Sequence, residues 1–163
     1  MTSTAHDPAR QILRHSLAIV AYRGGKALRG APESFAAFAA GANARTPAKL
    51  LSHIGDLFDW ALSIASGKQA WHDSKALPWD AEVARFFASL QKFDEYLASG
   101  EPLHAPAEGL LQGPIADALT HVGQLAMLRR LAGCPIKGEN YFKAEITAGR
   151  VGFEQATPTS EFS

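Results

Sequence analysis

Four stretches of the sequence repeat apolar residues every three to four positions, the spacing of an amphipathic helix, whereas alternating, strand-like stretches are scarce. They cover about residues 8–29, 46–66, 80–99 and 114–132. A helix with one apolar face must bury that face against another element, and four such helices can do so together in a four-helix bundle. We therefore expect an all-α chain that folds as an up-down four-helix bundle.

Residues that favour helix ends frame these stretches. Asp7 followed by Pro8, and Thr46 followed by Pro47, match a side-chain N-cap and a proline in the first turn. Asp80 is the expected N-cap of the third helix. Glycine favours the position just after a helix, so the helices are expected to stop at Gly67, Gly100 and Gly133.

Glycine and proline also predict where the regular structure weakens. The adjacent Gly24 and Gly25 predict that the first helix bends or frays before Gly30. A connector with two prolines and two glycines precedes Pro114, which is the expected first residue of the fourth helix.

The length of 163 residues suits a single domain with a sizeable core. We expect this domain to span residues 1–155 and to include a short extra helix at about Tyr141–Ile146. Residues 156–163 are terminal, so they are expected to form a disordered tail.

Composition excludes several classes of partner. Sixteen basic and sixteen acidic residues give a formal net charge of zero, so no field of one sign attracts nucleic acid, and we expect no nucleic-acid partner. No stretch is long and apolar enough for a membrane span, and the N-terminus lacks the pattern of a signal peptide. The single cysteine, Cys134, excludes an intramolecular disulfide and fits a reducing compartment. A cytoplasmic protein without membrane contact is the expectation.

Polar residues interrupt the apolar pattern of the fourth helix. Asp117, His121 and Gln124 follow one another at helical spacing, and His53 lies at the rim of the apolar face of the second helix. Two imidazoles and a carboxylate from facing helices could converge on zinc, nickel or ferrous iron and leave coordination positions open. In the alternative reading, the Asp-x-x-x-His pair makes a local contact and the remaining histidine lies at the core edge.

The segments that carry these residues resemble a known family. Residues 121–125 (HVGQL) and 128–130 (LRR) resemble the fourth-helix motif of the DinB-like, or YfiT-like, superfamily of metalloenzymes. Residues 50–62 (LLSHIGDLFDWAL) resemble its second-helix segment, and residues 138–141 (GENY) fit its tail. The likeness extends from about residue 10 to residue 155, and it implies a DinB-like topology with a long connection between the second and third helices.

The resemblance implies a metal site with one departure from the family pattern. The family motif begins with His-x-x-x-His, and Asp117 stands here in place of the first histidine. The implied ligands are His53, Asp117 and His121, and we expect zinc or nickel, with iron as an alternative. A carboxylate is a competent ligand in such a set. Alternatively, Asp117 only forms hydrogen bonds and the site has lost its metal.

Other polar residues have two readings each. Asp56 could accept the second ring N–H of the histidine on its helix, or lie solvated on the surface. Gln124 could orient a bound water or make a hydrogen bond between helices. Glu139 and Tyr141 could fold over the open end of the bundle and line a pocket, or anchor the tail. His72 has no partner pattern and is assigned no role.

The activity expected from the resemblance is that of a thiol-dependent transferase or a hydrolase. A low-molecular-weight thiol, bound to the metal as thiolate, would react with a small-molecule electrophile. A homodimer is expected, because the first and fourth helices often supply dimer contacts in such bundles. The alternative is a non-catalytic, dimerising helical-bundle binding protein with a vestigial or structural metal site.

Overall fold

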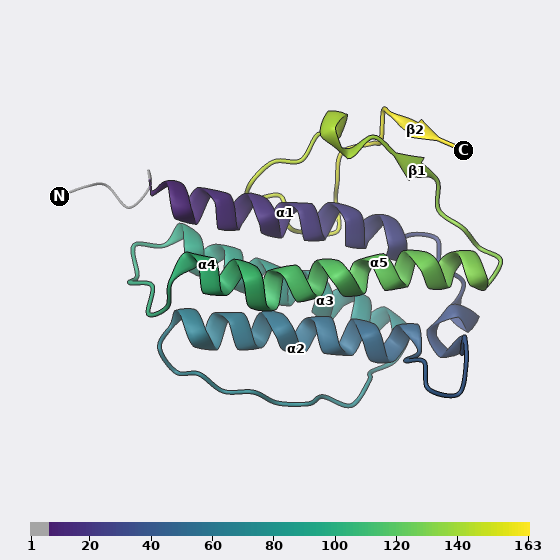
Figure 1. Cartoon of the computed structure of the whole chain (residues 1–163), viewed down its shortest axis with the longest axis horizontal. Helices are drawn as coiled ribbons and strands as arrows, with labels where there is room; N and C mark the ends of the chain where they lie inside the picture. The colour runs from purple at the N-terminus through teal and green to yellow at the C-terminus, as the bar shows by residue number, and fades with distance from the viewer. Residues whose placement is uncertain (1–6) are drawn as a thin grey trace.

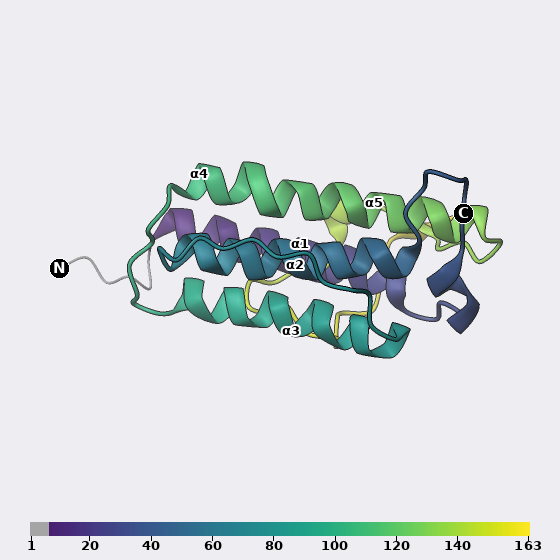
Figure 2. The same cartoon turned by 90° about the horizontal axis from the view of Figure 1, so that it is seen from below.

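The computed structural model describes residues 7–163, so residues 1–6 of the expected domain lie outside the described part. Within it, four long helices lie side by side along the long axis of the molecule (Figures 1 and 2), as α1 Pro8–Leu28, α2 Pro47–Ala65, α3 Trp79–Ala98 and α5 Ala116–Leu131. The only strands in residues 7–163 are the two-residue β1 Gly138–Glu139 and β2 Glu161–Phe162. The all-α prediction is confirmed.

The helices do not alternate in direction along the whole chain. Figure 1 shows α1 and α5 running one way and α2 and α3 running the other. Residues 66–78 return along α2 to the end where α2 began, and at about 3.3 Å per residue they can cross about 40 Å. The 19-residue α2 is only about 28 Å long. The predicted up-down order is therefore wrong between α2 and α3, because the connection is long enough to make these helices parallel.

The two predicted proline-containing helix starts are confirmed. The side chain of Asp7 accepts a backbone N–H of the first turn of α1 at 3.0 Å. The Thr46 hydroxyl does the same for α2 at 3.4 Å. The prediction of Asp80 as the N-cap of α3 is wrong by two residues, because the helix begins at Trp79 with Pro78 as its N-cap, and Asp80 lies within its first turn. There the Glu82 carboxylate reaches back and accepts the backbone N–H of Leu77 at 2.8 Å.

Helix α1 continues through both glycines to Leu28, contrary to the predicted bend. The ring of Phe86 on α3 lies against the backbone at Gly24, where an added Cβ would lie 2.5 Å from Cζ. The glycine therefore permits close packing of α1 and α3 within an unbroken helix. The cost of glycine in a helix interior is offset by that contact.

The last helical rod begins earlier than predicted. The short α4 Ala107–Leu110 leads into a π-helical turn, Leu111–Ile115, and this turn continues directly into α5. Pro114 lies inside the turn rather than at a helix start. Proline lacks a backbone N–H and crowds the carbonyl of the preceding turn, and a wider π turn accommodates both effects without ending the helix.

The C-terminal segment lies along α1 (Figure 1). The predicted helix at Tyr141–Ile146 is reduced to a single 3-10 turn, Tyr141–Lys143. The disordered tail predicted for the last residues is wrong, because β2 pairs with β1 in antiparallel register. Glu161 forms an ion pair with Lys26 at 3.3 Å, and the ring of Phe162 packs on Gly138, so this pairing is fixed by side chains as well as by backbone.

One apolar core runs between the long helices. Its largest fully buried aromatic side chains are Phe35, Phe58, Phe86 and Phe93.

Within the part of the chain that the structure describes, no helix is long and apolar enough to cross a membrane.

Substitution of Gly24 tests the close approach of α1 and α3. Gly24→Ala is expected to lower the free energy of unfolding by about 1–3 kcal/mol, because the added methyl group collides with Phe86 in a packed core. The matched control is Gly123→Ala in α5, where a Cβ meets no atom within 4 Å, and a gain of about 0.5–1 kcal/mol is expected. Urea unfolding measures both changes, and equal effects at the two positions would contradict the packing described.

Candidate metal centre

The three residues predicted as metal ligands meet at the interface of α2 and α5. His53 projects from α2, and Asp117 and His121 lie one turn apart on α5. The Asp117 carboxylate lies 3.8 Å from Nε2 of His53 and 3.3 Å from Nε2 of His121. One donor atom from each of the three residues lies within 4.8 Å of the other two, so the cluster could hold a metal ion.

The cluster lies at the edge of the core. The side chains of His53 and His121 are 20% and 12% exposed, whereas that of Asp117 is 48% exposed. The two imidazole rings meet edge to face with their centroids 4.9 Å apart. The two histidines are therefore held by packing, and solvent or a small molecule can approach from the side of the carboxylate.

Gln124 fixes the orientation of one histidine. Its Oε1 lies 3.0 Å from Nδ1 of His121, one turn away on the same helix. This contact holds the imidazole ring with Nε2 facing Asp117. The bond is made within α5, which differs from both roles predicted for Gln124.

The surroundings of His53 favour its neutral form. Burial lowers its pKa below the ordinary value of 6.5, and the positive charge of Arg45 lowers it further. Asp117 and Asp56 act in the opposite direction but do not outweigh these effects. The ring of Trp71, carried by the connection between α2 and α3, lies edge to face with the imidazole ring, with the ring centroids 5.7 Å apart. His53 is thus a neutral imidazole near pH 7, the form that binds metals.

A pocket of about 780 Å³ opens beside the histidines. His53 and His121 lie in its wall together with apolar side chains from both helices, among them Leu50, Met127 and Leu128. Arg45, in the loop before α2, also lines it. Sequence reasoning missed Arg45, because helical periodicity carries no information about where a loop residue lies.

Asp56 lies in a different environment from the one predicted. Its carboxylate accepts the backbone N–H of Ser74 at 2.9 Å and Nη2 of Arg85 at 2.5 Å, and neither of its oxygens makes a hydrogen bond to His53. Burial raises its pKa, but the hydrogen bonds from Ser74 and Arg85 together outweigh burial, so the pKa lies below 3.8. Asp56 is an ionised, buried structural group rather than a partner of the histidine.

Glu139 and Tyr141 lie against α1 and do not line the pocket. The Glu139 carboxylate is fully buried and accepts hydrogen bonds from the Tyr22 hydroxyl at 2.6 Å and from Nζ of Lys26 at 2.8 Å. Burial and the bond to this carboxylate raise the pKa of Tyr22. The ring of Tyr141 packs on the guanidinium of Arg23, 4.2 Å from its centroid. Both residues anchor the C-terminal segment.

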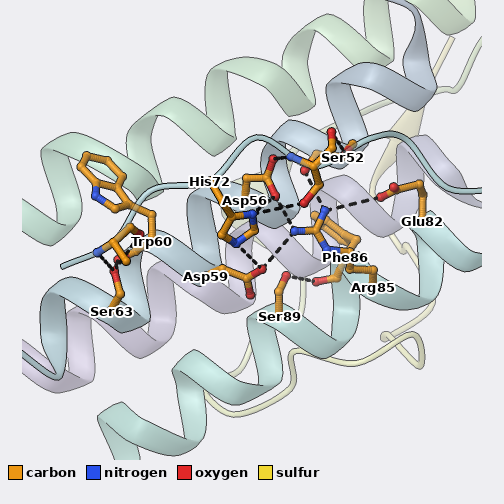
Figure 3. A network of polar contacts seen from close by, with 12 residues as sticks. Ser52, Asp56, Asp59, Trp60, Ser63, His72, Glu82, Arg85, Phe86 and Ser89 are labelled. Atoms are coloured by element: carbon orange, nitrogen blue, oxygen red, sulfur yellow. Dashed lines mark hydrogen bonds and ion pairs between the residues drawn. The ribbon is translucent and has the colours of Figure 1, made fainter. Parts of the chain in front are cut away.

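A second group of potential ligands surrounds Arg85 (Figure 3). Asp56, Asp59 and His72 offer donor atoms within 4.8 Å of one another. Nη2 of Arg85 lies 2.5 Å from the Asp56 carboxylate and 3.0 Å from that of Asp59, and His72 contacts the same two carboxylates at 3.2 and 3.3 Å. The guanidinium already supplies the positive charge that a metal would bring there. This cluster is therefore a clasp between α2, α3 and their connection.

Sequence reasoning missed the role of His72 in this clasp. The histidine lies in the irregular connection, and only the return of the connection along α2 brings it to Asp56 and Asp59. Glu82 also lies at the edge of the clasp, with one carboxylate oxygen buried, without a hydrogen bond, and 4.0 Å from Nη1 of Arg85.

Comparison of the chain with family models, curated proteins and solved structures finds no match.

Asp56→Asn tests the clasp through its pH dependence. The variant is expected to lose about 1–3 kcal/mol of unfolding free energy at pH 7, because a buried ion pair and its hydrogen bonds are weakened. The folded-state pKa of Asp56 is lowered, so its stabilising contribution is present above about pH 4 and disappears as pH falls through the folded-state pKa.

Urea unfolding between pH 7 and pH 3 measures the gap in unfolding free energy between the variant and the unsubstituted chain. The gap should shrink in acid. The control, Asp73→Asn, removes an exposed carboxylate from the same connection and should change stability by less than about 0.5 kcal/mol. A gap that stays constant to pH 3 is incompatible with an ionised, stabilising Asp56.

Proposed function

We propose that this chain is a metal-dependent enzyme of the DinB-like superfamily, in which His53, Asp117 and His121 hold one divalent ion, zinc or nickel. The convergence of these three donors beside a pocket of about 780 Å³ carries the proposal. The long return connection between parallel α2 and α3 supports the DinB-like four-helix bundle implied by the sequence motifs.

The donor set fits such an ion. Two donors about 2.1 Å from a tetrahedral ion lie about 3.4 Å apart. Nε2 of His121 lies 3.3 Å from Oδ1 of Asp117 and Nε2 of His53 lies 3.8 Å from Oδ2, and one donor atom from each of the three residues lies within 4.8 Å of the other two. Two neutral imidazoles and one carboxylate leave at least one position for an exogenous ligand.

The proposed reaction is transfer of a low-molecular-weight thiol to a small electrophile. When bound, a divalent ion supplies Lewis acidity that stabilises a thiolate at neutral pH. Gln124 holds the ring of His121 in the orientation that directs Nε2 toward the site. Leu50, Met127 and Leu128 form an apolar wall on which the apolar part of the electrophile would pack. Hydrolysis by a metal-activated water is the other form of the same chemistry.

A non-catalytic, dimerising bundle with a structural metal site is the second candidate. Among the described residues that line the pocket, none carries a carboxylate, thiol or phenol that could act as a general acid or base beside the histidines. Exposed apolar side chains lie on α1 (Ile12) and on α5 (Leu131), the two helices expected to supply dimer contacts, and could take part in such a contact. A measured activity would distinguish the two candidates.

Metal content tests the proposed ligands. Protein purified without an affinity tag should contain close to one zinc or nickel ion per chain by elemental analysis. His53→Ala and His121→Ala should each lose it, whereas His15→Ala, which removes an exposed histidine from α1, should retain it. Equal metal content in all four proteins, or none after reloading at neutral pH, would falsify the assignment.

Two substitutions of Asp117 test whether the acid is a ligand. Asp117→Ala should weaken zinc binding by at least about tenfold, because one of three protein ligands is lost. Asp117→His should preserve binding, because it supplies an imidazole at the position that carries histidine in the family motif. A competition titration with a chelating dye measures both. Unchanged affinity in Asp117→Ala would show that the carboxylate does not ligate.

Activity is tested by loading the protein with zinc or nickel and supplying small thiols with an electrophilic dye. The loaded protein should accelerate conjugate formation, and His121→Ala should reduce the rate to that of the uncatalysed reaction. Gln124→Ala should retain the metal with about ten- to a hundredfold less activity or affinity, because the ring of His121 loses its orienting bond. Stoichiometric metal without rate enhancement for any thiol, or for ester and amide hydrolysis, would favour the non-catalytic candidate.

A further inference from the structure

Arg45 is a charged side chain without a protein partner at the edge of the pocket. It lies directly before the N-cap of α2 and lines the pocket that contains His53 and His121. Within residues 7–163, no carboxylate or carbonyl pairs with its guanidinium. By contrast, Arg14 and Arg85 are paired with carboxylates and Arg129 with backbone carbonyls. A guanidinium has five donors, and those of Arg45 are available to a ligand.

The remainder of the pocket wall carries little charge. Its other polar members, Asn43, Thr120 and Gln124, are neutral, and much of the wall is apolar. Arg45 is therefore the one permanently charged side chain among the described residues that line this pocket. Small-molecule sites typically combine an apolar wall with a few polar groups that fix the orientation of the ligand. A single cation in such a wall is complementary to a ligand with an apolar body and a single negative charge.

We propose that the substrate of this pocket is a small organic acid whose carboxylate binds Arg45 while its apolar body packs against Leu50, Met127 and Leu128. The inference rests on the proposed function, since it names the chemical class of the substrate. A planar guanidinium matches a carboxylate with two parallel hydrogen bonds. The single charge of the guanidinium balances the single charge of a carboxylate.

The position of Arg45 also orients the acid. Arg45 and His53 line both this pocket and a smaller hollow of about 370 Å³ that continues toward the connection between α2 and α3. A carboxylate held at Arg45 therefore fixes one end of the ligand beside the candidate metal centre. Arg45 is thus a specificity-determining residue, and the remainder of the ligand lies in the larger pocket with His53 and His121.

Calorimetric titration with 3-phenylpropionate and its uncharged amide, 3-phenylpropionamide, tests the inference. Both probes are titrated into protein stripped of metal with a chelator and into protein reloaded with zinc. The acid should bind at least about tenfold more tightly than the amide, as expected for charge-assisted hydrogen bonds. Arg45→Gln should abolish that preference and leave amide binding unchanged. Arg130→Gln, which removes an exposed guanidinium outside the pocket wall, should preserve it.

Three results overturn the inference: equal binding of acid and amide, an acid preference that survives in Arg45→Gln, or no binding of either probe at millimolar concentration. Thermal unfolding checks that each variant is folded. The measurements on metal-free protein distinguish failure of the carboxylate site from failure of the proposed metal site. A chain that takes up no zinc but still prefers the acid through Arg45 refutes the metal site and retains the carboxylate site. A chain that binds zinc through His53 and His121 but does not prefer the acid refutes the carboxylate site and retains the metal site.

Discussion

The partly buried ion pair of Asp56 and Arg85 joins three parts of the molecule that are separate in the sequence. Asp56 belongs to α2 and Arg85 to α3, and the backbone N–H of Ser74 brings the connection between them to the same carboxylate. The chain can place α2 and α3 parallel only by returning along α2, and this clasp holds the return in place (Figure 3). The same connection carries Trp71 to His53, so the clasp also builds one side of the candidate metal centre.

Two clusters of similar composition each include residues of α2 and have different roles. Around Arg85, a guanidinium within hydrogen-bonding distance of both carboxylates neutralises them. Around Asp117, no such cation lies among the described residues, and the two histidines present their Nε2 atoms to a half-exposed carboxylate. The first arrangement is complete without a ligand, because its charges are balanced within the protein. The second has no permanent cation beside its carboxylate among the described residues, and for that reason it is the better candidate for function.

Local sequence signals predicted local structure well. Apolar periodicity indicated an all-α chain, and the capping residues Asp7 and Thr46 placed two helix starts, because each depends on side chains only a few residues apart. The helical spacing of Asp117 and His121 put both on one face of α5. Their meeting with His53 was predictable because each lies at the edge of an apolar face that must be buried.

Long-range features were not predictable from these signals. The direction of α3 depends on where an irregular connection returns, and the π turn at Pro114 depends on packing that keeps the helix going. The sequence pattern around Asp56 fits a solvated surface acid, because the ion pair that buries it is formed with Arg85 on another helix. Arg45 and the tail pairing were missed for the same reason, since loops and short strands acquire their positions from tertiary contacts.

We propose that the chain holds one divalent ion between α2 and α5 rather than at the clasp. Anomalous diffraction at the zinc edge, from crystals grown with zinc, locates such an ion directly. We expect a single strong peak about 2.0–2.2 Å from Nε2 of His53, Nε2 of His121 and a carboxylate oxygen of Asp117. A peak between Asp56, Asp59 and His72, or no peak at either cluster, would contradict it.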